Sequence, residues 1–293
     1  MKHAIDHLVL CVNDLDEARG FYERLGFTLT PLARHPFGTA NHLAQLEGNF
    51  LEILAVVDPA RIPKVPPGEF GFGAFNAAFV AKRQGMSTLV LPSDDARGDQ
   101  RAFAARGLDT YAPFDFARAA RLPDGGSVTV SFSLAFVTSR DMPDAVFFTC
   151  QQHAPQYFWK AEYQRHANGA RAIVEVLMIA EAPARLADFY GKLLGPGLVR
   201  KEGDGLRLAL EGSSLAILTP GQFKARYPAI ESPESGAGPH FAGYRVAVAD
   251  LPSAEAILSR NQIPFRRSGG RLQIVPADAF GTLIEFAAAG DAL

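Results

Sequence analysis

The chain has 293 residues, of which 48% are hydrophobic and 20% charged, and this leaves room for a large core and more than one domain. Its formal net charge of −2 gives no reason to expect a nucleic-acid partner, and no apolar run reaches the ~18 residues of a membrane-spanning helix. The only two cysteines, Cys11 and Cys150, are too few for a disulfide scaffold, so we expect a reduced, cytoplasmic protein.

The first 57 residues contain the clearest pattern of elements. An apolar strand is predicted over residues 4–12, followed by a helix that begins after Asn13 or Asp14 and ends at Gly26. Three more strands follow, at residues 27–31, 42–46 and 50–57. The order strand, helix, strand, strand, strand defines one β-α-β-β-β module.

The same order is predicted three more times along the chain. A connection over residues 58–85, with one short helix near residues 75–81, precedes the second module. An aromatic-rich linker over residues 153–169, which also suits a lid or a packing arm, precedes the third. The helices of the later modules are predicted at residues 96–106, 183–194 and 251–261. In the second module, strands are predicted at residues 87–91, 128–137 and 145–151, and residues 110–122 form one long strand or a strand pair. The strands of the third module are predicted at residues 172–180, 198–202, 206–210 and 215–219, and those of the fourth at residues 241–248, 264–267, 271–275 and 282–287.

Short sequence similarities between the modules support a duplication. The segment FYERLG at residues 21–26 is similar to FYGKLLG at residues 189–195, and LEI at residues 51–53 is similar to IEF at residues 284–286. Repeated units of this size bury their apolar faces against one another. We therefore predict an α+β fold of four β-α-β-β-β modules, arranged as two paired-module domains that are joined by the linker. The predicted domains are residues 1–152, with modules 4–57 and 86–152, and residues 170–293, with modules 170–221 and 240–289.

Three features of the first module indicate a family. His7 on the first strand, FYERLGF on the helix and LEIL on the fourth strand resemble the vicinal oxygen chelate superfamily, which includes glyoxalase I, extradiol dioxygenases and bleomycin- or fosfomycin-resistance proteins. The segment RHPFGTAN at residues 34–41 is similar to the glyoxalase-like branch. The resemblance is good over residues 4–57, fair over 170–289 and poor over 86–152. It implies that two modules pair into a curved sheet around a cleft that holds a divalent metal.

The resemblance gives His7 and Glu52 the positions of metal ligands. If the first and fourth strands lie side by side, the two side chains face each other on one surface. An imidazole and a carboxylate suit iron, manganese, zinc or nickel. The alternative is a neutral core histidine that is hydrogen-bonded to a partly buried glutamate. Two ligands do not define a metal site, so the second module has to supply the rest.

The second module offers weaker ligands. Thr88 occupies the position that matches His7, and residues 149–151 match the position of Glu52. Gln151, Gln152 or His153 completes the metal site only if the register shifts by one or two residues, and Cys150 does so only as a thiolate. In the C-terminal half the matching positions hold no histidine, but Glu175, Gly243, Ala216 and Glu285. These residues are interpreted as structural, the alternative being a metal-free binding cleft.

Four polar residues are predicted to border the first cleft and to bind the substrate, namely Arg34, His35, Asn41 and His42. Arg34 is suited to clamp a substrate carboxylate. The alternative is an ordinary polar loop. The 22 phenylalanines either line an apolar pocket or fill the core.

The resemblance implies a metal-assisted lyase, isomerase or dioxygenase-type enzyme that acts on a small oxygen-rich or aromatic metabolite in the N-terminal cleft. Glu52 is the predicted proton-transfer base. The competing hypothesis is a non-catalytic, metal-free binding protein of the bleomycin-resistance kind, and a third is a degenerate scaffold that dimerises. The expected partner is a small molecule, neither nucleic acid nor membrane, and a homodimer stays open.

Overall fold

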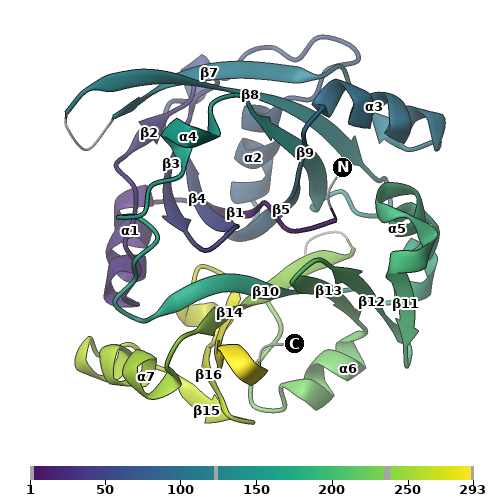
Figure 1. Cartoon of the computed structure of the whole chain (residues 1–293). Helices are drawn as coiled ribbons and strands as arrows, with labels where there is room; N and C mark the ends of the chain where they lie inside the picture. Colours follow the sequence, from purple (N-terminus) through teal and green to yellow (C-terminus); the bar gives the residue numbers. More distant parts are fainter. Residues whose placement is uncertain (1–2, 122–124, 234–237, 292–293) are drawn as a thin grey trace.

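Two curved sheets, packed back to back, make up the protein (Figure 1). The computed structural model describes residues 3–121, 125–233 and 238–291. One core of buried apolar side chains from both sheets fills the space between their backs. The concave sides of the sheets therefore face away from each other, one at the top and one at the bottom of Figure 1.

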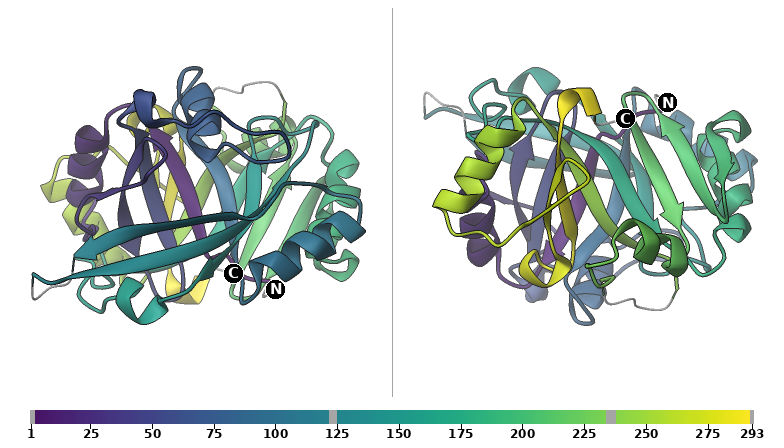
Figure 2. Two further views of the ribbon diagram at one scale, coloured as in Figure 1. Left: turned by 90° about the horizontal axis from the view of Figure 1, so that it is seen from above. Right: turned by 90° about the horizontal axis from the view of Figure 1, so that it is seen from below.

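The first sheet has nine strands in the order β2-β3-β4-β1-β5-β9-β8-β6, and β7 pairs with β8. Helix α2 lies inside its curl, whereas α1 and α3 lie on its two flanks (Figures 1 and 2). The elements are β1 (His7–Val12), α1 (Leu15–Arg24), β2 (Ala33–Arg34), β3 (Thr39–Gln45), β4 (Phe50–Val56), α2 (Phe72–Val80), β5 (Gly85–Pro92), α3 (Ala96–Ala105), β6 (Asp109–Thr110), β7 (Phe114–Arg121), β8 (Ser127–Thr138) and β9 (Val146–Gln152).

The second sheet has eight strands in the order β11-β12-β13-β10-β14-β17-β16-β15. The short helix α4 (Pro155–Phe158) lies in the connection between the sheets. The other elements are β10 (Ala170–Ile179), α5 (Ala187–Leu194), β11 (Val199–Glu202), β12 (Gly205–Leu210), β13 (Ser213–Leu218), α6 (Pro220–Arg226), β14 (His240–Val248), α7 (Leu251–Arg260), β15 (Arg266–Ser268), β16 (Arg271–Ile274) and β17 (Leu283–Ala288).

Strand pairing confirms the predicted α+β fold of paired β-α-β-β-β modules. In each module the first strand runs parallel to the last, in the pairs β1–β4, β5–β9, β10–β13 and β14–β17. The first strands of two modules then pair antiparallel, β1 with β5 and β10 with β14. Within residues 110–122, predicted as one long strand or a strand pair, the structure has the strand pair, because Pro113, which cannot donate to a ladder, separates β6 from β7.

Helix α1 shows how local sequence produces this packing. The Asp14 side chain accepts hydrogen bonds from the backbone of Asp16 and Glu17, which begins the helix as predicted. Its buried stripe includes Tyr22, whose hydroxyl is 2.8 Å from that of Tyr244 on β14. This contact joins the two sheets inside the shared core. Among the described residues, no helix is long and apolar enough to cross a membrane.

The connection between the sheets packs against the first sheet instead of extending into solvent. The side chain of Gln45 donates to the carbonyl of Phe158 at 2.8 Å and accepts from the backbone of Lys160 at 3.1 Å. The ring of His166 accepts from the backbone of Thr28 at 3.0 Å, and its other nitrogen is 2.7 Å from the Gln45 carbonyl. Residues 155–166 therefore form one wall at the open side of the first sheet.

Candidate functional site

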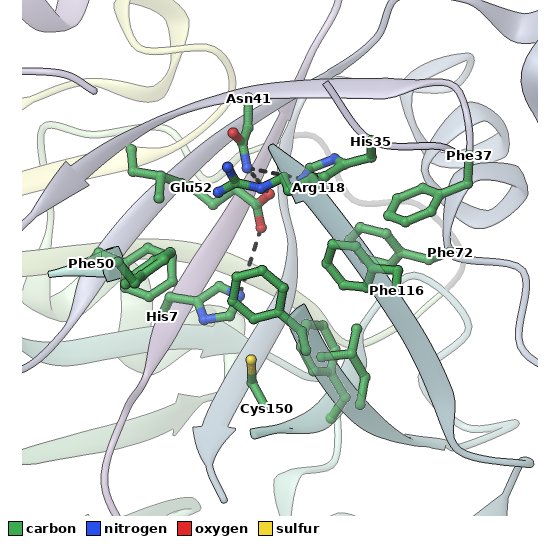
Figure 3. Close-up of a pocket in the computed structure, with 15 residues that line it drawn as sticks. His7, His35, Phe37, Asn41, Phe50, Glu52, Phe72, Phe116, Arg118 and Cys150 are labelled. Carbon is green, nitrogen blue, oxygen red and sulfur yellow. Dashed lines mark hydrogen bonds and ion pairs between the residues drawn. The ribbon is translucent and has the colours of Figure 1, made fainter. Parts of the chain in front are cut away.

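The concave side of the first sheet encloses a cavity of about 50 Å³, which we call the inner cavity (Figure 3). Its walls come from β1, β3, β4, β7, β8 and β9, together with α2 and α4. The lining residues are His7, His35, Phe37, Asn41, Leu43, Phe50, Glu52, Phe72, Phe116, Arg118, Phe132, Leu134, Phe148, Cys150 and Phe158.

His7 and Glu52 point into this cavity from neighbouring strands. The parallel register pairs His7 with Phe50 and Val9 with Glu52, and this places both side chains on the concave face. His7 Nε2 is 3.6 Å from Glu52 Oε2, and His7 Nδ1 is 2.6 Å from a carboxylate oxygen of Asp6. The imidazole ring also stacks on the ring of Phe50 at 4.3 Å. Asp6 and Phe50 thus fix the direction in which Nε2 points.

Asn41 links this pair to His35. Its amide donates to Glu52 Oε1 at 2.6 Å and lies 3.4 Å from His35 Nε2. Burial lowers the pKa of His35 to about 3, and the charge of Arg118 adds to the shift, so this ring is neutral at pH 7. Its Nε2 therefore accepts from Asn41 while Nδ1 donates to Thr39 Oγ1 at 2.8 Å. The chain of bonds holds Glu52 in one orientation.

Phenylalanine rings make up most of the remaining wall. Ring-to-ring contacts connect Phe148 to His7 at 5.6 Å and Phe116 to Phe132 at 5.0 Å. These rings exclude water and offer faces and edges to a flat apolar ligand. Seven of them line the cavity: Phe37, Phe50, Phe72, Phe116, Phe132, Phe148 and Phe158.

Arg118 is a lining residue that the sequence reasoning missed. It lies on β7, and its guanidinium carbon is 5.8 Å from the centre of the Phe132 ring. Burial lowers the pKa of its guanidinium, and the charge of Glu52 opposes this shift. The sequence did contain a signal for this position, because Phe114, Phe116 and Arg118 alternate along β7 and therefore share one of its faces.

The other predicted site residues lie outside the inner cavity. His42 points to the opposite face of β3, where Nδ1 is 2.7 Å from the carbonyl of Thr30. Gln151 bonds to the backbone of the turn before α3, and His153 Nε2 is 2.8 Å from Ser133 Oγ on the opposite face of β8. Arg34 lines an adjoining surface cleft. The structure therefore brings together His7, Glu52, His35 and Asn41, but neither Gln151 nor His153 faces them.

A family model described as the glyoxalase-like domain matches residues 5–194 of the chain. This match covers more than half of the sequence and includes every residue of the inner cavity. The chain belongs to the glyoxalase-like domain family. A search of curated proteins gives no match.

Solved structures support the same fold for this glyoxalase-like chain, which is that of the vicinal oxygen chelate superfamily. A hypothetical protein from Staphylococcus aureus is 14% identical with a TM-score of 0.66, over 97% of this chain and 99% of that one. A mutant 4-hydroxymandelate synthase from Streptomyces coelicolor is 15% identical with a TM-score of 0.59, over 97% and 92%. A fusion of a xylose isomerase-like TIM barrel with 4-hydroxyphenylpyruvate dioxygenase is 12% identical with a TM-score of 0.53, over 98% and 49%. At these identities the likeness shows the fold alone.

The glyoxalase-like chain does not supply a complete metal site. In the first module, Glu52 lies two residues after Phe50, the strand partner of His7. In the second module, Phe148 lies two residues after Val146, the strand partner of Thr88, and so occupies the position equivalent to Glu52. A phenyl ring therefore occupies the position from which the second module would donate. In the described ranges, no group of three or more His, Cys, Asp or Glu side chains is arranged to hold a metal ion. Catalytic zinc and non-haem iron sites use three protein ligands, so His7 and Glu52 alone do not fit one.

The concave face of the second sheet carries charges that satisfy one another. Arg245 is 2.8 Å from a carboxylate oxygen of Glu175 and 3.0 Å from one of Glu285. Arg226 on α6 also pairs with Glu175, and the Tyr227 hydroxyl donates to Glu285 at 2.8 Å. Burial alone would raise the pKa of Glu175, but these arginines outweigh it and hold the pKa below its ordinary value. This network supports the structural interpretation of the C-terminal carboxylates.

Proposed function

We propose that the inner cavity is the active site of an enzyme that acts on a small aromatic or oxygen-rich molecule, with Glu52 as the proton-transfer base. The observation that carries this proposal is a buried carboxylate beside an imidazole, set in a wall of phenylalanines. Glu52 is 7% exposed and His7 4% exposed, yet both side chains face the cavity. Functional groups kept in an apolar cleft of this kind are typical of active sites.

The side chains around Glu52 would bind the ligand and orient the carboxylate. The phenylalanine rings would hold a flat apolar part of the ligand and exclude water. Asn41 occupies Glu52 Oε1, which leaves Oε2 directed toward His7 and the cavity. A proton taken from the ligand would therefore go to Oε2, which lies 3.6 Å from Nε2 of His7, a ring positioned by Asp6.

The metal stays a prediction of the family resemblance. A bound iron, manganese, zinc or nickel ion would polarise oxygen atoms of the ligand as a Lewis acid. His7 and Glu52 supply two donors, and Phe148 stands at the opposite position. We therefore propose no step through a metal, and metal analysis of the purified protein tests the prediction directly.

A non-catalytic binding protein is the second candidate. It is favoured by the lining, in which seven of fifteen residues are phenylalanines, and by the small volume of about 50 Å³. Such a protein would hold an apolar molecule without changing it. The two candidates differ in whether the carboxylate of Glu52 is needed for more than binding.

The test begins with a panel of diols, keto-aldehydes and catechols, scored by thermal shift with and without Mn²⁺ or Fe²⁺. Compounds that bind are then incubated in D₂O, and proton exchange or conversion is followed by NMR. An enzyme exchanges or converts a ligand, and Glu52→Gln binds it but loses this activity. Glu47→Gln, which changes an exposed carboxylate outside the cavity, is the matched control. Binding without exchange in the unmodified protein would favour the second candidate, and absence of any binding would refute both.

We also propose a cytoplasmic location, because Cys11 and Cys150 are both buried as free thiols. Burial raises the pKa of Cys11 to about 12 and that of Cys150 well above its ordinary value, so neither is a thiolate at neutral pH. A homodimer stays a prediction, and sedimentation of the purified chain tests it.

A further inference from the structure

A second hollow opens to the surface beside the inner cavity. This outer cleft has a volume of about 350 Å³ and lies between the segment before β2, the ends of β7 and β8, and the residues that follow α4. Leu43, Arg118 and Phe158 line both hollows. The outer cleft therefore adjoins the proposed active site, and these three side chains belong to the walls of both hollows.

The outer cleft is positively charged. Arg34, Arg118 and Lys160 line it, and none of its described lining residues is an aspartate or a glutamate. Within the described part of the chain, no ion pair involves Arg34 or Lys160. The Lys160 ammonium donates only to the Gln156 carbonyl at 3.3 Å and lies 5.9 Å from the Tyr157 ring. Only Arg118 is close to a carboxylate, that of Glu52 in the inner cavity, so the solvent side of the cleft has a local positive potential.

Arg118 connects this charge to the inner cavity. Its Nε is buried and has no hydrogen-bond partner among the described residues, and its Nη1 donates to the Ala119 carbonyl at a long distance of 3.5 Å. Figure 3 shows the guanidinium beside Asn41 and Glu52 at one end of the cavity. A buried donor without a partner is costly, and an anion at this position would satisfy it.

We propose that the outer cleft binds the anionic group, a carboxylate or a phosphate, of a ligand whose aromatic part occupies the inner cavity. This inference rests on the proposed function of the inner cavity and names the charge of its ligand. Arg118 binds the anion at the boundary, and Arg34 and Lys160 bind it from the solvent side. Aromatic acids therefore bind more tightly than their uncharged amides.

The test compares 4-phenylbutyrate with 4-phenylbutyramide, which differ only in charge at one end, and adds 2-phenylethyl phosphate to distinguish carboxylate from phosphate. Affinities are measured by calorimetry at low and at high salt. The double variant Arg34→Gln/Lys160→Gln removes two cations of the cleft. Arg165→Gln/Arg260→Gln is the matched control, because both of these arginines are exposed and neither lines a hollow.

We expect the unmodified protein to bind an anionic probe about tenfold more tightly than the amide at low salt. Salt and the cleft variant both reduce this preference, whereas amide binding is unchanged and the control variant behaves like the unmodified protein. The better of the two anionic probes identifies the group. Equal affinity for acids and amide, or a preference that survives in the cleft variant, would overturn the inference while leaving the proposed function standing. If no probe binds, the proposed function for aromatic ligands fails and the inference fails with it.

Discussion

Replacing Arg245 with methionine would test how the second sheet is stabilised. Arg245 is 4% exposed and pairs with two carboxylates, Glu175 and Glu285, which are 2% and 0% exposed. Removing one partner of a buried ion pair costs ~3–5 kcal/mol, because the other charge stays buried without compensation. Glu175 keeps Arg226, and Glu285 keeps neutral hydrogen-bond donors. We therefore expect Arg245→Met to lower the free energy of unfolding by ~3 kcal/mol at pH 7.

Urea unfolding of the whole chain measures this loss. Arg19→Gln is the surface control, because Arg19 and Glu23 form an exposed pair within α1, and it should cost no more than ~0.5 kcal/mol. The double variant Arg245→Met/Glu285→Gln should recover part of the lost stability. In the single variant the buried carboxylate of Glu285 has lost its ion pair with Arg245, and the second substitution removes this uncompensated charge.

The pH dependence gives a further check on the same variant. The pKa of Glu175 is lowered in the folded protein, so its contribution to stability is present above its ordinary pKa of 4.5 and is lost as the pH falls through the lowered value. The cost of Arg245→Met should therefore shrink as the pH falls below 4.5 and through the lowered pKa of Glu175. A loss below ~1 kcal/mol at pH 7, or a double variant that is less stable than the single one, would refute the reasoning.

Three further outcomes are expected. Asn41→Leu removes the donor to Glu52 Oε1 and should lower turnover by roughly tenfold or more, measured with any substrate found in the panel; unchanged turnover would contradict its positioning role. Burial lowers the pKa of His166, so the stability that its hydrogen bond from Thr28 contributes is present above pH 6.5 and is lost as the pH falls through the lowered pKa. Protection factors in residues 153–169, which correct for the slower intrinsic amide exchange at low pH, should fall between pH 7.5 and 5, and this fall should be absent in His166→Gln. Phe148→Ala should cost ~3–5 kcal/mol in urea unfolding, and a cost below ~1 kcal/mol would show that its site in the cavity wall is loosely packed.

The fold could be predicted from the sequence because local signals and the repeat agree. Asp14 and Gly26 bound the first helix, and the same order of elements recurs four times. Helix α2 was expected only near residues 75–81 and as part of a connection. Its place inside the first sheet depends on long-range contacts such as the hydrogen bond from Ser87 to Asn76, which no local pattern reveals.

The candidate site could be predicted only in the first module. His7 and Glu52 lie on strands whose parallel register follows from the module, and Asn41 enters from the adjacent strand. In the second module the prediction depended on register, and a displacement of one residue moves a side chain to the other face. Gln151 and His153 were predicted to face the site from an assumed register that the structure does not have. Arg118 reaches the cavity from β7 in the second module, and its alternation with phenylalanines was the only local signal for this.

The shared core between the sheets has a consequence for how the chain can be divided. The hydroxyls of Tyr22 and Tyr244 meet in the interior, and the family match continues into the second sheet as far as residue 194. In a fragment that ends at residue 152, the apolar faces of β1 and α1 that now lie in the shared core would be exposed to water. The isolated first half would then expose a large apolar surface and would associate with other molecules. A shortened version of this protein should therefore keep both sheets, and only the exposed loops of the second sheet should be shortened.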